Sequence, residues 1–281
     1  MKILILGVTG MIGSSIYREF LLSKKCITYG TYKDNKKINF LKKKNKLFYF
    51  NVSKKAVLKS IVKDIRPNIV INCIGLTKHL YVRSDKKITK INSDFPHYAK
   101  KISNKFNAKF VQISTDCVFN GKKGNYHERD RPNAKDLYGI SKAAGEIYDD
   151  FNLTIRTSTI GHEIKTQYGL LEWFLSIKNS CQGFSRAYFN GLPTYYLSKV
   201  LLVLLYKFDV TGLLHVSGTK INKYNLLNKI NKIYNKKIII NKNSDFKIDR
   251  TLNNSKLKKY IKHIPNWNNL ISGMKKNNDK K

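Results

Sequence analysis

Short apolar segments alternate with longer amphipathic segments through the first 160 residues of the chain. The apolar segments predict buried strands, and the amphipathic segments between them predict helices that each have one inward face. A helix between two successive strands returns the chain to the same edge of the sheet, so the strands run parallel. We therefore predict an α/β fold, a Rossmann doubly wound parallel sheet. The predicted strands are residues 3–6, 26–32, 47–50, 69–74, 109–114 and 153–156, and the predicted helices are residues 12–23, 54–63, 94–106 and 136–150.

The alternation becomes less regular after residue 160. We expect residues 161–275 to form mainly a smaller C-terminal lobe over the carboxyl ends of the strands. Residues 1–160 then form the Rossmann domain, and later segments return to it. Residues 276–281 are polar and lysine-rich, which predicts a disordered tail. Apolar spacing within the lobe predicts helices at 170–178, 197–206 and 223–234, and short strands at 213–216 and 238–240.

Composition narrows the class of protein. Hydrophobic residues make up 42% of the 281 residues, which is enough for a packed core. The apolar run at residues 3–6 is too short for a signal peptide or a membrane span, and no later run reaches about 18 residues. We expect a cytoplasmic protein with no membrane association, no metal and reduced thiols. The four cysteines are scattered, without a metal-ligand spacing: Cys26, Cys73, Cys117 and Cys181.

The formal net charge of +36 raises the question of nucleic-acid binding. Lysine supplies most of this charge and is spread over the whole chain among many asparagines, whereas arginine, which makes forked contacts to phosphates and bases, is scarce. We therefore predict no nucleic-acid partner. A positive field of this kind would still attract a small anionic substrate.

A glycine-rich turn joins the first predicted strand to the first predicted helix. Glycines at 7, 10 and 13 permit a tight turn and let the backbone approach a pyrophosphate, which the helix N-terminus then faces. This strand–turn–helix context indicates a dinucleotide site and makes residues 1–160 an NAD(P)-binding domain. The Gly-x-x-Gly-x-x-Gly spacing looks like that of extended short-chain dehydrogenases/reductases. The predicted cofactor-binding residues of the turn are Gly7, Thr9, Gly10, Met11, Ile12 and Gly13.

The ends of the next strands supply further cofactor candidates. Lys33 follows the second strand and would reach a ribose 2′-phosphate, whereas Asp34 would bind a 2′-hydroxyl. Because the lysine comes first, we predict NADPH, with NADH as the alternative. Asn51 and Val52 follow the third strand, on the adenine side. Cys73, Ile74 and Gly75 end the fourth strand and are expected to line the cofactor path.

Tyr138 and Lys142 are four residues apart on a predicted helix and therefore lie on one face of it. Reduction of a carbonyl needs a hydride and a proton for the developing alkoxide. A tyrosine has an ordinary pKa of about 10, and a neighbouring ammonium favours its phenolate. We predict that Tyr138 donates the proton and that Lys142 supports it and holds the nicotinamide ribose. Thr115 ends the fifth strand, where its hydroxyl would bind the substrate carbonyl, with Ser114 beside it.

Three motifs carry a family resemblance. Residues 114–121 read STDCVFNG, residues 126–130 read YHERD, and residues 138–146 read YGISKAAGE. Together with IRTS, GLPT and GLLHVSG further along, these motifs resemble the dTDP-4-dehydrorhamnose reductase family over about residues 1–218. The resemblance implies that Thr115, Tyr138 and Lys142 are the catalytic set. It also implies that the C-terminal lobe binds a nucleotide-sugar.

Two positions depart from the family pattern. Cys117 stands where the family has an aromatic residue, and Thr159 stands where it has a tryptophan. Both positions would border the sugar, so dTDP-rhamnose is not assigned as the product. His162 and Glu163 follow closely, and the sequence leaves open whether they contact the sugar or only form a loop. The candidate substrate-binding residues are Ser114, Thr115, Asp116, Cys117, Thr159, and Arg186 and Arg250 for the diphosphate.

The sequence therefore predicts NAD(P)H-dependent reduction of a 4-keto nucleotide-sugar, in the biosynthesis of deoxysugars or surface polysaccharides. An epimerase or dehydratase of the same superfamily is one alternative, although the Asp-Glu pair of a dehydratase does not follow Thr115. A non-catalytic NADP-binding regulatory subunit is the other. Whether the protein forms a homodimer stays open.

Overall fold

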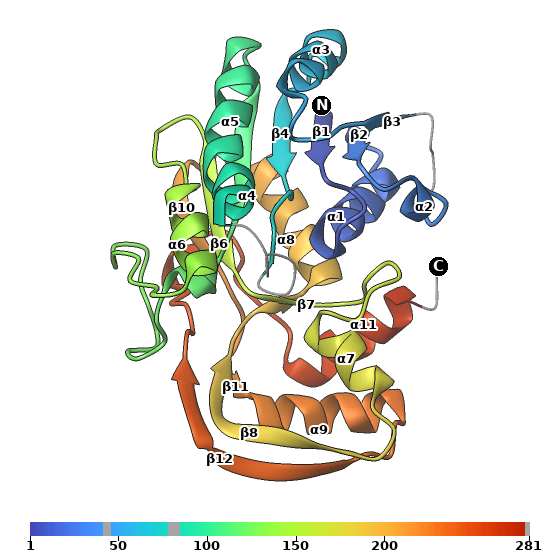
Figure 1. Ribbon diagram of the computed structural model, residues 1–281, viewed down its shortest axis with the longest axis vertical. Helices are drawn as coiled ribbons and strands as arrows, with labels where there is room; N and C mark the ends of the chain where they lie inside the picture. Colours follow the sequence, from blue (N-terminus) through green and yellow to red (C-terminus); the bar gives the residue numbers. More distant parts are fainter. Residues whose placement is uncertain (42–45, 78–84, 279–281) are drawn as a thin grey trace.

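The computed structural model describes residues 1–41, 46–77 and 85–278 of the chain. Seven strands form one sheet in the order β10–β6–β5–β4–β1–β2–β3, and every neighbouring pair is parallel (Figure 1). The chain starts at β1 and winds outward in both directions, so β1 and β4 flank the switch point. The strands are β1 (Lys2–Leu6), β2 (Ile27–Tyr32), β3 (Leu47–Tyr49), β4 (Ile69–Asn72), β5 (Lys109–Thr115), β6 (Leu153–Thr157) and β10 (Gly212–Val216).

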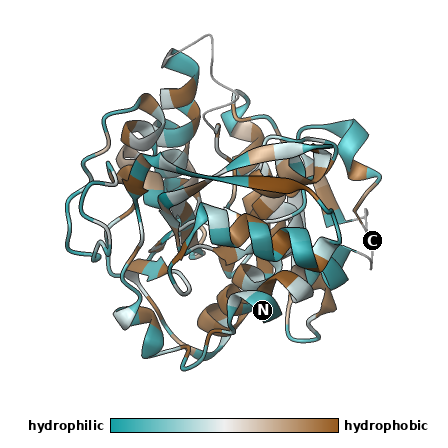
Figure 2. Ribbon diagram, turned by 90° about the horizontal axis from the view of Figure 1, so that it is seen from below, coloured by the Kyte–Doolittle hydropathy of each residue, from teal (hydrophilic) through white to brown (hydrophobic). Residues whose placement is uncertain are grey.

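Helices cover both faces of this sheet. Ile3 and Ile5 of β1 face one apolar cluster, and Leu4 and Leu6 face the other, because successive side chains alternate across a strand. Helices α1 (Met11–Leu22) and α8 (Thr194–Lys207) pack together on the first face, and α3 (Lys55–Ile65) and α5 (Phe95–Lys105) cover the second. The predicted Rossmann sheet is therefore confirmed. Figure 2 shows the hydrophobic colour gathered toward the inside and hydrophilic residues along the outer loops.

The helix that follows β5 is shorter than the sequence predicts. Helix α6 (Leu137–Ala144) ends at Gly145, whereas the apolar pattern predicts a helix to residue 150. Gly145 is the C-cap residue of the helix, and a Cβ on it would lie 1.9 Å from the Asn92 carbonyl oxygen, so only glycine fits where the helix ends. Other short elements precede or flank the strands: α2 (Asn35–Ile38), α4 (Asp85–Thr89), the π-helical turn η3 (Lys90–Asp94) and the 3₁₀ turn η4 (Asp116–Val118).

The C-terminal lobe has its own three-stranded sheet. Strand β8 (Ser180–Phe189) lies between β11 (Ile221–Asn222) and the long edge strand β12 (Ile239–Asp249), and α7 (Leu170–Ser176) and α9 (Lys223–Tyr234) lie beside this sheet (Figure 1). The prediction missed β8 and most of β12. Their polar and charged residues do not form an apolar run, and the pairing of the two strands with each other stabilises them.

Later segments do return to the Rossmann sheet. Strand β10 pairs with β6, and α8 packs on α1. A two-stranded sheet of β7 (Thr159–Ile160) and β9 (Leu192–Pro193) connects the two parts. Short helix α10 (Ser255–Lys258) contacts β10. Among the described residues, no helix is long and apolar enough to cross a membrane.

The expected disordered tail is wrong for residues 276–278. Helix α11 (Trp267–Asn278) includes these residues, because its apolar side chains recur at helical spacing and pack into the core. Residues 279–281 of the expected tail lie outside the described residues. The buried side chains of this helix are Trp267, Leu270, Ile271 and Met274.

Candidate active site

The turn between β1 and α1 brings backbone against backbone. Gly7 has a φ of +85°, a conformation that favours glycine. A Cβ on Gly13 would lie 2.2 Å from the Gly7 carbonyl oxygen, so only glycine lets α1 start this close to the turn. No side chain caps the helix at Gly10. The first N–H groups of α1 therefore face a space beside the turn that a Cβ would fill. The glycine turn and these N–H groups fit a dinucleotide pyrophosphate.

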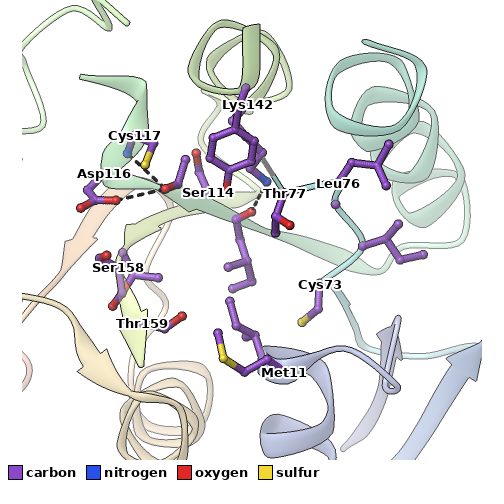
Figure 3. Close-up of a pocket in the computed structure, with 17 residues that line it drawn as sticks. Met11, Cys73, Leu76, Thr77, Ser114, Asp116, Cys117, Lys142, Ser158 and Thr159 are labelled. Carbon is purple, nitrogen blue, oxygen red and sulfur yellow. Dashed lines mark hydrogen bonds between the residues drawn. The ribbon is translucent and has the colours of Figure 1, made fainter. Parts of the chain in front are cut away.

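A cavity of about 250 Å³ lies at the carboxyl edge of the sheet, beside this turn. Figure 3 shows Met11 on one side of the cavity and Lys142 and Ser114 on the opposite side, with Cys73 and Thr159 between them at either flank. Twelve of the predicted site residues line it: Met11, Ile12, Cys73, Ile74, Gly75, Ser114, Thr115, Asp116, Cys117, Tyr138, Lys142 and Thr159.

Thr115 and Tyr138 lie together in this cavity. The Thr115 hydroxyl hydrogen-bonds the Tyr138 phenol, donates to Asp116 Oδ1 at 3.1 Å and accepts from the Cys117 backbone N–H at 3.1 Å. Burial raises the pKa of Tyr138, and the charges of Cys117 and Asp116 raise it further, whereas the hydrogen bond with Thr115 lowers it. The phenol is therefore protonated at neutral pH, as a proton donor must be.

Lys142 is buried on the same face of α6 as Tyr138, and its side chain reaches the backbone of β5. Its Nζ donates to the Ile113 carbonyl oxygen at 2.8 Å and lies 3.8 Å from the position of a Cβ on Gly75. Burial lowers the pKa of Lys142 to about 8, and the charges of Glu146 and Cys73 act in the opposite direction. The expectation that this ammonium draws the Tyr138 pKa toward neutrality is not met, because burial of the phenol dominates.

Asn92 lines neither cavity but supports the first one, a role that the sequence did not indicate. It lies in the π-helical turn η3, is 1% exposed, and accepts from the Leu76 backbone N–H at 2.8 Å. Its amide donates to the Leu76 carbonyl at 3.0 Å and to Ser141 Oγ at 3.2 Å. Asn92 thus ties the segment after β4, which lines the cavity, to α6, which carries Tyr138 and Lys142. It precedes the predicted helix at 94–106, so no periodic pattern marked it.

A second cavity, of about 350 Å³, adjoins the first and shares Asp116, Cys117 and Ser158 with it. Two cations line it, Arg250 and Lys223. Arg250 was predicted from the sequence, whereas Lys223 was not, because it begins α9 in an ordinary polar context. Aromatic and apolar side chains from the lobe complete the lining: Leu170, Trp173, Phe184, Ala187, Tyr188, Phe189, Leu227, Phe246 and Ile248, together with Gln182.

The charges around Asp116 are coupled. Burial raises the pKa of Asp116, while the charges of Arg250 and Lys223 lower it. Burial lowers the pKa of Lys223 to about 8, while Asp116 and Cys117 raise it. Arg250 Nε donates to the Phe119 carbonyl at 2.8 Å, Nη1 donates to Cys117 Sγ at 3.8 Å, and Nη2 lies 3.9 Å from Asp136 Oδ2. Two cations facing one carboxylate give this cavity a site for an anionic group.

Several predicted residues lie elsewhere. Lys33 is exposed at the end of β2, and Asp34 caps α2 by accepting from the Lys36 N–H at 2.9 Å. Asn51 accepts from Ser53, and Val52 packs on the apolar cluster under α3. None of these four predicted residues lines either cavity, and their cofactor roles stay predictions.

The three remaining candidates line neither cavity. Arg186 of β8 is exposed and lines neither cavity. His162 is 8% exposed and hydrogen-bonds Glu172 at 2.6 Å through Nδ1. Glu163 accepts from the backbone N–H groups of Tyr168 and Gly169, just before α7. His162 and Glu163 therefore hold the loop after β7 against the lobe, which agrees with the reading of these two as loop residues.

The parallel sheet, the glycine turn and the smaller mixed sheet define an α/β protein with a Rossmann-type fold and a C-terminal lobe. The particular family follows from the sequence: the RmlD substrate binding domain matches residues 1–269, and the chain belongs to this family. The predicted resemblance to dTDP-4-dehydrorhamnose reductases is thereby confirmed.

Solved structures cover nearly the whole chain. A hypothetical dTDP-4-dehydrorhamnose reductase from Sulfolobus tokodaii is 26% identical with a TM-score of 0.79, over 92% of this chain and 94% of that one. A dTDP-4-dehydrorhamnose reductase from Bacillus anthracis, in complex with NADP, is 21% identical with a TM-score of 0.79, over 97% of this chain and 98% of that one. At this identity the second likeness concerns the fold.

Another relative is named as a subunit of a different enzyme and not as a reductase. The methionine adenosyltransferase 2 subunit beta of Xenopus tropicalis is 26% identical over 146 residues, which is 52% of this chain and 41% of the relative. The chain thus covers less than half the length of this curated relative.

Proposed function

We propose that this protein is an NADPH-dependent reductase of a 4-keto nucleotide-sugar. One observation carries the proposal: Thr115, Tyr138 and Lys142 line a single cavity at the switch point of the sheet, next to the glycine turn. The adjoining cavity, with its two cations and aromatic lining, supports a nucleoside diphosphate as the anchoring part of the substrate. The cytoplasm is the proposed location, since all four cysteines are reduced thiols.

The proposed mechanism divides the work among three side chains. When bound, NADPH supplies the hydride that the keto carbon accepts. Tyr138 holds its proton at neutral pH and gives it to the substrate oxygen as that oxygen becomes an alkoxide. Thr115 hydrogen-bonds the Tyr138 phenol and orients it. Lys142 presents a buried ammonium to the ribose hydroxyls.

The second cavity suits the other end of the substrate. Arg250 and Lys223 offer charge-assisted hydrogen bonds to a diphosphate, next to Asp116 and Cys117 at the junction of the two cavities. Phe184 and Phe246 form an edge-to-face pair with ring centres 5.4 Å apart, at a position where a nucleobase would stack. The small Cys117 and Thr159 side chains leave the sugar part of the junction open.

Replacement of Tyr138 by phenylalanine tests the proposal. Purified Tyr138→Phe protein is assayed for NADPH oxidation with a panel of 4-keto nucleotide-sugars, alongside the matched variant Tyr206→Phe. Tyr206 donates to the Lys25 carbonyl at the opposite end of the molecule. Loss of the proton donor is expected to lower turnover by about 10²-fold or more, with NADPH affinity within about threefold. Full turnover by Tyr138→Phe would disprove the assigned role.

The curated relatives support a second candidate, an NADP-binding subunit of another enzyme. The proteins concerned are named as a subunit of methionine adenosyltransferase 2. This candidate predicts that wild-type protein binds NADPH, consumes none with any keto sugar of the panel, and changes the activity of a partner enzyme. An epimerase or dehydratase would convert its sugar with no net NADPH consumption. Stoichiometric NADPH loss therefore separates the reductase from all three alternatives.

A further inference from the structure

A buried ion pair lies directly behind the cavity. Glu146, just after α6, is 3% exposed, and Arg156 of β6 is 1% exposed. Arg156 Nε donates to Glu146 Oε1 at 2.9 Å, and Arg156 Nη2 donates to Oε2 at 2.8 Å. The guanidinium also lies 5.1 Å from the centre of the Phe119 ring. This forked pairing holds the carboxylate in one orientation.

The same carboxylate contacts a residue that lines the cavity. Ser114 Oγ donates to Glu146 Oε1 at 2.5 Å, and Tyr148 OH donates to Oε2 from the solvent side. Because the one hydroxyl proton of Ser114 is directed at Glu146, only oxygen lone pairs remain toward the cavity. Ser114 is therefore held as a hydrogen-bond acceptor, and because the Thr115 hydroxyl donates to Asp116, Tyr138 is left as the donor to a keto oxygen.

Glu146 also balances the charge of Lys142. The two residues are four apart along the chain, where α6 ends, and Glu146 is the foremost charge that raises the pKa of this lysine against the effect of burial. The other titratable groups that line the cavity with Lys142 are the Cys73 thiol after β4, Tyr138 four residues earlier on α6, and Asp116 after β5. Among these groups, Glu146 is the carboxylate that does not line the cavity in which the substrate would bind.

We infer that Glu146 is a positioning residue of this site: held by Arg156, it fixes the Ser114 hydroxyl as an acceptor and sets a buried anion four residues after Lys142. The inference rests on the proposed function, because it assigns a task to a residue that touches neither cofactor nor substrate. A merely structural ion pair would affect folding and leave the ionisation of Lys142 unchanged.

The experiment measures the NADPH dissociation constant by fluorescence titration between pH 6 and 9.5. Glu146→Gln alone leaves Arg156 buried without its partner and endangers folding. The test variant therefore combines Glu146→Gln with Arg156→Met, which removes both charges. Glu146→Asp serves as the conservative rescue. Tyr148→Phe is the matched control, since it removes one hydrogen bond from the solvent side of the same carboxylate. Circular dichroism checks that each variant is folded.

In wild-type protein, affinity should begin to fall as the pH rises through about 8, where Lys142 loses its proton. In the double variant this bend should move to lower pH, because Glu146 is the member of the removed pair that raises the pKa of Lys142. Glu146→Asp should return it toward the wild-type position, and Tyr148→Phe should leave it in place. A folded double variant with the wild-type bend, or a wild type with no bend, overturns the inference. A wild type that binds no NADPH overturns the proposed function instead.

Discussion

The third glycine of the turn gives the sharpest test of the cofactor site. A Cβ at Gly13 would lie 2.2 Å from the Gly7 carbonyl oxygen and 2.9 Å from its carbon, both of them backbone atoms. An ordinary contact begins near 3.4 Å, so α1 must move by about 1 Å to admit the methyl of Gly13→Ala. Helix propensity alone would favour alanine by about 1 kcal/mol, whereas overpacking costs about 1–3 kcal/mol and more when backbone must shift.

We expect Gly13→Ala to lower the free energy of unfolding by about 1–2 kcal/mol. For a chain of this size the melting temperature then falls by about 2–8 °C. Gly10 is the matched control. Its backbone φ of −84° suits alanine, and a Cβ there would lie 3.6 Å from the Gly7 oxygen, an ordinary contact. Gly10→Ala should therefore melt within about 2 °C of wild type.

The two variants separate packing from cofactor binding. Both should weaken NADPH binding by about tenfold or more, Gly13→Ala because the turn shifts and Gly10→Ala because its methyl occupies the pyrophosphate approach. Differential scanning fluorimetry with and without NADPH measures both effects. A Gly13→Ala protein as stable as wild type would refute the packing argument. Wild-type NADPH affinity in Gly10→Ala would refute the location of the site.

Two further predictions concern charges. Although burial raises it, hydrogen bonds from Asn152 and other neighbours bring the pKa of Asp149 down to about 2. The ionised Asp149 carboxylate stabilises the fold above about pH 4, and this stabilisation is lost as the pH falls to about 2. In urea unfolding, Asp149→Asn should therefore lower the free energy of unfolding by about 1–2 kcal/mol at pH 7 and by nothing near pH 2. Lys223→Met should weaken dTDP binding by about tenfold or more in calorimetry, because a charge-assisted hydrogen bond is lost. Wild-type affinity for dTDP should fall above about pH 8, as Lys223 loses its proton, and a flat pH profile would count against this contact.

The Rossmann half could be predicted because its information is local. Buried parallel strands are apolar on both faces, so a run such as Ile3–Leu6 is visible without knowledge of its neighbours. The cofactor side of the cavity follows from the fold, since the glycine turn and the end of β5 must meet at one edge of the sheet. Lobe strands β8 and β12 are stabilised by pairing with each other, and their polar residues show no pattern of their own.

The same distinction explains which site residues were missed. Lys223 looks like any of the many lysines until α9 places it beside Asp116, a residue far away in the sequence. Asn92 supports the first cavity only because the segment after β4 folds back onto it. Arg186 had the chemistry expected of a diphosphate ligand, but β8 leaves it exposed and outside both cavities. Chemistry that depends on long-range contacts cannot be assigned from residue type.

The ionisation of the site bears on the direction of the proposed reaction. With the pKa of Lys142 near 8 and that of Tyr138 raised, both groups carry their protons at neutral pH. A phenol in this state can give a proton to the alkoxide that the proposed reduction forms. Turnover in that direction should be constant from about pH 6 to 7.5 and decline above about pH 8, as Lys142 loses its charge; a rate that rises through pH 9 would instead indicate a phenolate base.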